Sequence, residues 1–198
     1  MNWLRLLLFP LSVIYGWIVA LRRWLYRNGL LSRARVETPS ISVGGLHVGG
    51  IGKTPISFHI LERLKVLGLR PALLSRGYGR SASGVLLRRS GEALDPSRFG
   101  DDPAMLGERM PDLEVVVAEN RFDGARYLET EVRPDCIVLD DAFSHLAFQS
   151  LLECVVLPAD PLDWYETVHM PAGTMREDWK AQGLSEQTLY WFHARRGP

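Results

Sequence analysis

Residues Ile41–Pro55 read ISVGGLHVGGIGKTP, an apolar run that enters a glycine-rich turn and leaves it through Lys-Thr. A phosphate-binding loop follows the pattern G-x-x-x-x-G-K-[ST] and joins a strand to a helix. Gly52, Lys53 and Thr54 match the end of this pattern, whereas His47 occupies the place of its first glycine. The alternative is a glycine turn without a ligand. The order of strand, glycines and helix favours the phosphate-binding loop.

The expected nucleotide contacts come from this turn and from the start of the helix that follows it. Glycine backbone N–H groups can surround phosphate oxygens, and the helix N-terminus adds a positive end. We expect Lys53 to reach the β- and γ-phosphates and to act in catalysis, and the Thr54 hydroxyl to bind Mg²⁺. The predicted ATP-binding residues are His47, Val48, Gly49, Gly50, Ile51, Gly52, Lys53 and Thr54.

Apolar runs alternate with amphipathic ones from residue 41 onward. We expect strands at 41–43, 72–75, 85–87, 114–118, 136–140 and 154–157, and helices at about 53–67, 102–109 and 121–131. This alternation predicts an α/β fold of the P-loop NTPase type. Its sheet should be mainly parallel with helices on both faces, and ligands should collect at the carboxyl ends of the strands.

The run CIVLDD, residues 136–141, predicts a buried strand that ends in two carboxylates. A Walker-B strand holds Mg²⁺ with an acid in this place. The pattern is common by itself, but here it follows a P-loop in the same chain. Asp140 and Asp141 are therefore predicted metal ligands, together with Thr54.

A second acidic pair, Asp101 and Asp102, lies in the stretch GDDPAML. One of the two could cap a helix that begins near Pro103. Alternatively, a carboxylate here could accept the proton of an attacking hydroxyl, as the base of a kinase does. The residues alone leave both interpretations open.

The stretch LSRGYGR follows another predicted strand and contributes Arg76, Tyr78 and Arg80. It is either a glycine turn with solvated arginines or a loop that binds phosphate on the nucleotide or the substrate.

The composition is that of a globular protein, with 46% hydrophobic and 23% charged residues. The 23 basic and 23 acidic residues cancel, so the charge balance gives no indication of a nucleic-acid partner. Cys136 and Cys154 each lie in an apolar run, which predicts two buried reduced thiols and a reducing compartment, the cytosol.

Residues 1–35 are predicted to form a separate N-terminal segment. Its uncharged stretch, Leu6–Leu21, has 16 residues between arginines and is interrupted by Pro10. A membrane span needs about 20 apolar residues, and the tryptophans and arginines around this stretch suit a lipid–water boundary. We therefore predict a helix that lies on or dips into a membrane surface. A buried N-terminal helix and a single membrane span are the alternatives.

Five motifs, GGIGKTP, LSRGYGR, GDDP, LDDAFSH and MPAGTMRE, occur in this order after a Trp- and Arg-rich apolar N-terminus. In this combination, over about residues 3–177, the chain resembles the tetraacyldisaccharide 4'-kinase family, the lipid A 4'-kinases of Gram-negative bacteria. The P-loop of that family also lacks the leading glycine. The resemblance implies a P-loop kinase at the cytoplasmic face of the inner membrane. Such an enzyme uses ATP and Mg²⁺ to phosphorylate the 4'-hydroxyl of a lipid substrate, tetraacyldisaccharide 1-phosphate.

The resemblance also implies roles for individual residues. Asp101 matches the acid thought to act as the catalytic base beside Lys53, and Asp140 and Asp141 match the Walker-B carboxylates. The remaining candidates for contact with substrate or phosphate are Arg76, Tyr78, Arg80, Asp102, His145 and Glu177.

The chain departs from the family pattern at several places. The motif DDAFSH has Ala142 and Ser144 where the family has glycine and glutamine, and Asp160 could replace an acid that the family has near this point. Family members also continue beyond the length of this chain into a second lobe with a histidine motif. We therefore expect a kinase domain at 36–183 and an atypical tail at 184–198.

The tail stretch SEQTLYWFHA, residues 185–194, lacks the alternation of a strand. A reading frame moved by two bases would permit a sequence that resembles the family, which suggests a frameshift between about residues 177 and 185. Coincidence through codon degeneracy is the alternative. A truncated, catalytically impaired ATP-binding protein at the membrane is the second function that this sequence supports. A transport ATPase subunit is disfavoured because the chain has no LSGGQ-type stretch.

Overall fold

The computed structural model describes residues 3–49, 52–158, 162–177 and 187–193. Seven strands form one sheet in the order β3-β4-β2-β5-β1-β6-β7. All neighbouring strands are parallel except β3 and β4. The strands are β1 (Ser40–Gly45), β2 (Pro71–Ser75), β3 (Leu86–Arg88), β4 (Glu114–Val117), β5 (Cys136–Leu139), β6 (Leu152–Pro158) and β7 (Gln187–His193). The helices are α1 (Trp3–Arg27), α2 (Lys53–Val66), α3 (Pro96–Phe99), α4 (Asp101–Arg109), α5 (Arg121–Glu131) and the 3₁₀ helix η1 (Trp164–Thr167).

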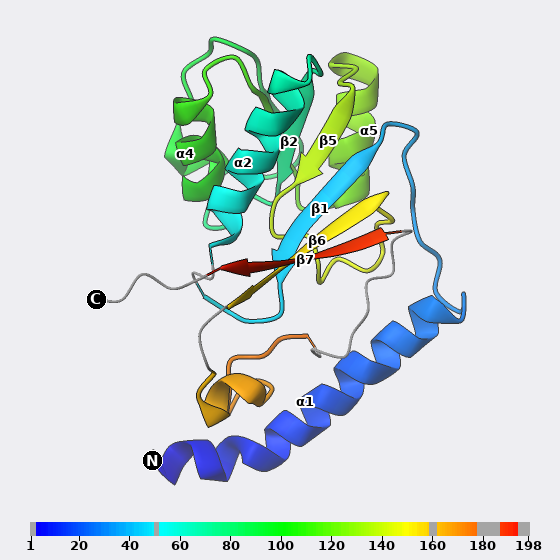
Figure 1. The fold of residues 1–198 in the computed structure, drawn as a ribbon, viewed down its shortest axis with the longest axis vertical. Coiled ribbons are helices and arrows are strands. Elements are labelled where there is room, and N and C mark those ends of the chain that lie inside the picture. Colours follow the sequence, from blue (N-terminus) through cyan, green and yellow to red (C-terminus); the bar gives the residue numbers. More distant parts are fainter. Residues whose placement is uncertain (1–2, 50–51, 159–161, 178–186, 194–198) are drawn as a thin grey trace.

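Helices cover both faces of this sheet, as the sequence predicted (Figure 1). On one face, α2 and α4 enclose a core that includes Ile56, Leu61 and Leu106. On the other face, α5 packs Ala125 and Leu128 against the strands. Every residue of β2 and β5 is buried, which explains why these strands read as continuous apolar runs. The predicted α/β fold with a mainly parallel sheet is confirmed.

The end of β1 lies unusually close to the loop that follows β5. A Cβ added at Gly44 would lie 2.5 Å from the Cβ of Phe143 and 2.7 Å from its backbone nitrogen. Only glycine permits this approach, because real side chains do not tolerate such contacts. The close approach brings the glycine-rich turn after β1 next to the acidic loop after β5.

Strand β7 forms in the stretch that lacks strand alternation. It pairs in parallel with β6 over seven residues, from Leu152↔Gln187 to Pro158↔His193. Leu189, Tyr190 and Trp191 are all exposed, so within residues 187–191 there is no buried face that would impose an alternating pattern. The pairing with β6 forms this strand, and a side-chain pattern therefore did not predict it.

Helix α1 continues through Pro10 for 25 residues, so the expected interruption at this proline is wrong. A proline inside a helix removes one backbone hydrogen bond, and here the surrounding turns persist. Among the described residues, α1 is the one helix long and apolar enough to cross a membrane by length and composition. Helix α1 is longer than the 16-residue uncharged stretch Leu6–Leu21 that lies within it.

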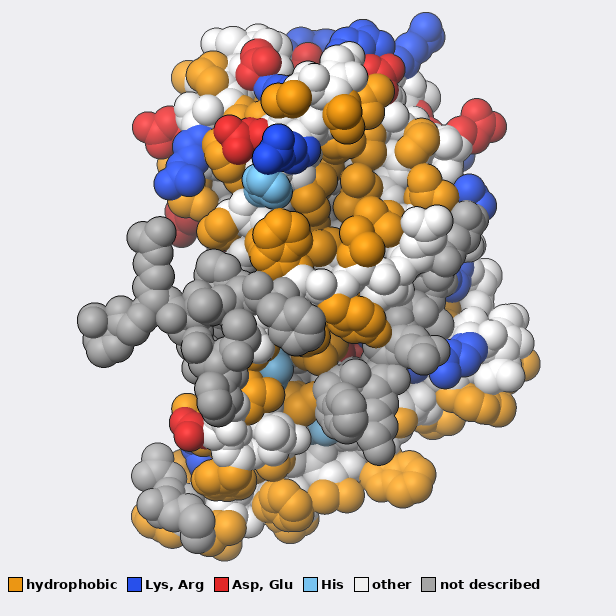
Figure 2. Space-filling model, in the orientation of Figure 1, with side chains coloured by type: hydrophobic (Ala, Val, Ile, Leu, Met, Phe, Trp, Pro, Cys, Tyr) orange, Lys and Arg blue, Asp and Glu red, His pale blue; other side chains and the backbone are white. Residues whose placement is uncertain are grey.

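Apolar side chains of α1 are exposed along its whole length, and they form the lower rim of the molecule in Figure 2. They include Trp3, Leu4, Leu7, Phe9, Leu11, Ile14, Trp17, Ile18, Leu21 and Trp24, all between 45% and 74% exposed. The buried residues of α1 are instead the polar Ser12 and Arg23. The alternative of a buried apolar N-terminal helix is therefore wrong.

The polar side of α1 packs on residues 164–177, which we call the docking segment and which lie beside α1 in Figure 1. The backbone N–H of Ala172 donates to the Ser12 hydroxyl at 2.8 Å. The Tyr15 hydroxyl donates to the Arg176 carbonyl at 3.3 Å. Near the start of the helix, the Arg5 guanidinium lies 4.1 Å from the centroid of the Tyr165 ring. These contacts fix α1 against the domain.

Cys136 and Cys154 lie in β5 and β6, and both are free and buried. Burial raises the pKa of the Cys136 thiol to about 11. The predicted burial of both thiols is confirmed.

Candidate functional site

A cleft of about 780 Å³ opens at the carboxyl ends of β1, β2 and β5. The glycine-rich turn, the LSRGYGR loop and the Asp140-Asp141 loop all contribute to it, as expected for a parallel sheet. Its walls are Arg22, Val48, Gly49, Lys53, Ser75, Arg76, Tyr78, Asp101, Asp102, Pro103, Glu119, Arg121, Asp140, Asp141, Ser144, His145 and Arg176.

The turn between β1 and α2 is described on both sides of residues 50 and 51, and a glycine with positive φ lies on each side. Gly49 and Gly52 have φ angles of 114° and 82°, a region that favours glycine. Gly52 precedes α2, so the N-terminus of this helix begins at Lys53, whose side chain faces the cleft. Gly50 and Ile51 lie outside the described residues, and their predicted contacts are not tested.

His47 lies on the other side of this turn. Its ring is buried, and Nε2 lies 2.9 Å from the carbonyl oxygen of Glu166 in the docking segment. The side chain therefore braces the turn against the docking segment, while Val48 and Gly49 line the cleft. This contact gives a physical reason for a histidine where the usual pattern has glycine.

Lys53, Asp141 and Arg176 form the charged centre of the cleft. The Lys53 Nζ lies 3.0 Å from Oδ1 of Asp141, and Arg176 donates to both carboxylate oxygens of Asp141. Burial alone would raise the pKa of Asp141, but the hydrogen bonds and charges of Arg176 and Lys53 hold it below its ordinary value. Asp141 is therefore an ionised carboxylate, and it keeps the phosphate-loop lysine in the cleft.

Asp140 has a different environment although it is the neighbour of Asp141. It is 3% exposed, and the buried Ser57 hydroxyl donates to its Oδ1 at 2.7 Å. Burial raises the pKa of Asp140 to about 6, against the hydrogen bond from Ser57, which lowers it. Within the described residues no cation forms an ion pair with this carboxylate. The charges of Lys53 and Arg121 act on it from beyond ion-pair distance.

These oxygen donors fit Mg²⁺. The ion prefers hard oxygen ligands and is usually bound by one or two carboxylates, together with waters and substrate phosphates. No group of three or more His, Cys, Asp or Glu side chains that could hold a metal occurs in the described part of the chain. The buried carboxylate of Asp140 lies beside the phosphate loop and has no ion-pair partner among the described residues. It is the feature that a divalent cation would complement.

Asp101 and Asp102 begin α4, with Gly100 as the residue before the helix. Neither aspartate caps the helix by a side-chain hydrogen bond, so the helix-cap interpretation is wrong. Asp102 accepts a hydrogen bond from the Thr54 hydroxyl at 3.3 Å, which joins α4 to the phosphate loop. Both carboxylates are exposed and line the cleft.

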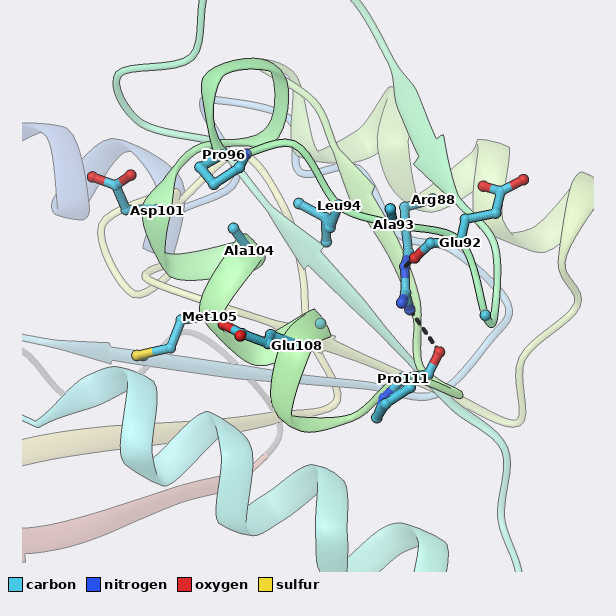
Figure 3. Close-up of a pocket in the computed structure, with 12 residues that line it drawn as sticks. Arg88, Glu92, Ala93, Leu94, Pro96, Asp101, Ala104, Met105, Glu108 and Pro111 are labelled. Atoms are coloured by element: carbon cyan, nitrogen blue, oxygen red, sulfur yellow. Dashed lines mark hydrogen bonds between the residues drawn. The ribbon is translucent and has the colours of Figure 1, made fainter.

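A second hollow, of about 700 Å³, lies on the other side of α4 (Figure 3). Asp101 lies at one end of it, with its carboxylate turned away from Arg88 and Glu92 (Figure 3). The buried Arg88 donates to the carbonyl oxygens of Glu92, Pro111 and Leu113. This arginine holds the backbone together, and the hollow has no phosphate-binding loop in its walls.

The predicted site residues of the LSRGYGR loop lie in two different environments. Arg76 and Tyr78 line the cleft and are exposed. Arg80 lies outside the cleft wall, where it pairs with Glu119 at 2.5 Å and donates to the Gly84 carbonyl at 2.6 Å. The predicted contact of Arg80 with phosphate finds no support in this geometry.

Glu177 also lies away from the cleft. It is 2% exposed, and its Oε2 lies 2.8 Å from Nε of Arg23 on α1. The position is that of a buried structural acid that ties the docking segment to the N-terminal helix. Its expected contact with substrate finds no support in this geometry, and the predicted acid Asp160 lies outside the described residues.

Three cationic side chains of the cleft were absent from the sequence predictions, namely Arg22, Arg121 and Arg176. Arg176 lies within the MPAGTMRE motif and Arg121 at the start of a predicted helix, so both had a local signal. Arg22 reaches the cleft from α1, and no local pattern connects it with the phosphate loop.

Residues 4–196 match a family model described as tetraacyldisaccharide-1-P 4'-kinase. The protein named tetraacyldisaccharide 4'-kinase from Chlorobium luteolum is 38% identical over 88% of this chain and 50% of its own length. A protein of the same name from Azoarcus sp. is 41% identical over 87% of this chain and 49% of its own. The chain thus spans about half the length of the curated relatives it matches.

The fold is also that of a solved structure, the "apo" form of LpxK from Aquifex aeolicus in complex with ATP. The two structures superpose with a TM-score of 0.82 at 33% sequence identity. The match covers 89% of this chain and 55% of the other.

Proposed function

This chain belongs to the tetraacyldisaccharide-1-P 4'-kinase family, and from that premise we propose that its cleft transfers the γ-phosphate of ATP to the 4'-hydroxyl of a tetraacylated disaccharide 1-phosphate. One observation carries the proposal. The phosphate-loop lysine Lys53, the Walker-B acids Asp140 and Asp141 and the exposed acid Asp101 all line one cleft. Phosphoryl transfer needs this set, namely a cation for the phosphates, carboxylates for Mg²⁺ and a base for the attacking hydroxyl.

Each of these residues has a separate role in the transfer. Lys53, held by Asp141, neutralises charge on the β- and γ-phosphates of ATP, and backbone N–H groups of the turn and the N-terminus of α2 position the triphosphate. Thr54 with Asp140 or Asp141 would hold Mg²⁺, which neutralises phosphate charge when bound. Asp101 accepts the proton of the acceptor hydroxyl as the hydroxyl oxygen attacks the γ-phosphorus. The bond from this phosphorus to the β–γ bridging oxygen breaks, and ADP leaves. Asp102, hydrogen-bonded to Thr54, keeps α4 next to the loop.

The N-terminal helix supports a membrane location for this reaction. Its contacts with the docking segment run from Arg5 to Arg23, 18 residues apart and thus about 27 Å along a helix at 1.5 Å per residue. A helix that crossed a bilayer would carry these polar partners into the hydrocarbon. A helix that lies in the interface keeps them in water and buries its apolar side in lipid. We place α1 in this way on the cytoplasmic face of the inner membrane, where ATP and reduced thiols occur.

ATP binding at the membrane without phosphate transfer is the second function that this loop and this helix could serve. Both functions use the same loop, and transfer to the lipid distinguishes them.

The test measures transfer and nucleotide binding in the same preparation. The chain is incubated with γ-labelled ATP, Mg²⁺ and tetraacyldisaccharide 1-phosphate in mixed micelles, and the position of label in the lipid is determined. Label at the 4'-oxygen is the expected result. ATP binding without labelled lipid would support the second function, and absence of both would overturn the proposal.

A further inference from the structure

Ser57 places a hydroxyl in the apolar core of the domain. It lies on α2, three residues beyond Thr54, and it is fully buried. Ile56 and Leu61 of the same helix belong to the core between α2 and the sheet. A buried hydroxyl costs free energy unless it forms a hydrogen bond. A serine at this position therefore needs a partner within the core.

The partner of this hydroxyl is the carboxylate of Asp140. The Ser57 hydroxyl donates to Oδ1 of Asp140 at 2.7 Å, whereas the Thr54 hydroxyl donates to Asp102. Residues three apart in a helix lie on the same face. Helix α2 thus presents two hydroxyls to two different acids of the cleft. Among the described residues, no other donor forms a hydrogen bond with the carboxylate of Asp140.

The backbone of Asp140 is held by two neighbouring segments. Its N–H donates to the carbonyl oxygen of Leu74 in β2 at 3.0 Å, and its carbonyl oxygen accepts from Arg121 at 3.2 Å. These contacts fix the backbone, but they leave the carboxylate free to rotate about the side-chain bonds. Within the described part of the chain, the hydrogen bond from Ser57 is the contact that fixes this rotation.

The orientation of Asp140 matters because the neighbouring acid already has cationic partners. Arg176 donates to both oxygens of Asp141, and the Lys53 Nζ lies 3.0 Å from its Oδ1. Asp140 lines the same cleft and forms no ion pair with any described cation. With Oδ1 held by Ser57, Oδ2 is the oxygen of Asp140 that remains for a divalent cation.

We propose that Ser57 is a positioning residue for the divalent cation, and that its hydroxyl holds Asp140 in the orientation that binds the ion. Ser57 is not part of the cleft wall, so it acts through Asp140 and does not touch nucleotide or acceptor. Loss of a group that orients a metal ligand typically reduces metal affinity by about 10- to 100-fold. The part of the ion in phosphate transfer rests on the proposed function, whereas the effect of Ser57 on metal binding does not.

Binding of Mn²⁺ tests this role without a measurement of transfer, since Mn²⁺ and Mg²⁺ share a preference for carboxylate and water ligands. Mn²⁺ is titrated into the chain with bound ADP, and free Mn²⁺ is measured by electron paramagnetic resonance. Ser57→Ala removes the donor, and Ser57→Thr keeps it. Ser40→Ala is the matched control, because Ser40 is also buried but begins β1, at the end of the strand away from the phosphate loop. The melting temperature and the ADP affinity in EDTA are measured for every variant.

We expect Ser57→Ala to bind Mn²⁺ at least about tenfold more weakly than wild type, with an unchanged ADP affinity in EDTA. Ser40→Ala should bind Mn²⁺ as wild type does. Ser57→Thr should also keep the wild-type Mn²⁺ affinity, even where its extra methyl group lowers the melting temperature. A serine that served only the stability of the fold would change the melting temperature and leave the Mn²⁺ affinity of the folded chain unchanged.

Unchanged Mn²⁺ affinity in Ser57→Ala, or an equal loss in Ser40→Ala, would overturn the role of Ser57. An equal loss of ADP affinity in EDTA, or a wild-type chain that binds no Mn²⁺ together with ADP, would also overturn it. If Ser57→Ala does not fold, Ser57→Cys, which offers a weak donor, should lose part of the affinity, and full affinity would contradict the proposal. A chain with Ser57-dependent Mn²⁺ binding that transfers no phosphate would refute the kinase proposal and leave this role standing.

Discussion

Arg23 on α1 and Glu177 in the docking segment form a buried ion pair, with 2.8 Å between Nε and Oε2. The Arg23 guanidinium also lies 4.8 Å from the ring centroid of Phe143, two residues beyond the metal-binding candidate Asp141. Arg176, the neighbour of Glu177, holds the Asp141 carboxylate. One cluster therefore connects the N-terminal helix to the charged centre of the cleft.

Loss of one member of this pair should destabilise the protein strongly. Glu177→Ala takes one carboxylate partner from the buried guanidinium of Arg23, and removal of one partner of a buried pair costs about 3–5 kcal/mol. The free energy of unfolding in urea measures this cost. A double variant, Arg23→Met with Glu177→Leu, should recover most of it, because an apolar pair needs no desolvated charge. If Glu177→Ala unfolds at the same urea concentration as wild type, the pair is not a structural link.

The exposed apolar side of α1 should control membrane attachment without controlling the fold. Trp17 and Ile14 are 74% and 57% exposed, so glutamates at these positions should leave the melting temperature unchanged. Co-sedimentation with vesicles of mixed neutral and anionic lipid should fall by at least about tenfold, since each buried apolar side chain contributes about 1.5–3 kcal/mol. Val66→Glu with Leu67→Glu is the matched control, because both residues are equally exposed at the end of α2. Equal losses for the two double variants would contradict the assignment.

The two acids at the start of α4 should have separable roles. Asp101→Asn should lower kcat by at least about 100-fold, because the attacking hydroxyl loses its base, and should change the ATP affinity little. Asp102→Asn should weaken Mg²⁺-dependent ATP binding, because Asp102 contacts Thr54. Glu108→Gln on the same helix faces the second hollow and should have no effect. An active Asp101→Asn variant would exclude this residue as the base.

The depressed pKa of His145 predicts a loss of stability in mild acid. The unfolded chain binds a proton at this histidine near its ordinary pKa of 6.5, whereas the folded chain resists it until about pH 4. Stability from this group should therefore fall as the pH decreases from about 6.5 to 4. Asp140, whose pKa is raised to about 6, changes the stability in the opposite direction over this pH range. It does so in wild type and in the variant His145→Asn alike. The difference between wild type and His145→Asn in urea unfolding isolates the histidine, and parallel pH profiles would contradict the prediction.

Local patterns predicted the parts of the fold that depend on local chemistry. The glycine-rich turn, the apolar strands and the Asp140-Asp141 pair all have short-range signals, and the parallel sheet then brings their carboxyl ends together. Local patterns did not predict where the side chains of Arg22, Arg80 and Glu177 lie. Their partners are set by packing between distant segments, and a sequence pattern does not distinguish an arginine in the cleft from an arginine that pairs with a nearby acid. Strand β7 was missed for a related reason, because backbone pairing with β6 and not side-chain burial forms it.

The rate of γ-phosphate transfer to tetraacyldisaccharide 1-phosphate by wild type, Lys53→Ala and Lys65→Ala tests the central claim most directly. Lys65 lies on the same helix and pairs with Asp112 outside the cleft, so its loss should leave the rate unchanged. We expect transfer by wild type and Lys65→Ala, and a loss of at least about 1000-fold for Lys53→Ala, since transfer depends on charge neutralisation at the phosphates. A Lys53→Ala variant that transfers phosphate as fast as wild type would contradict the assignment of this cleft as the site of the reaction.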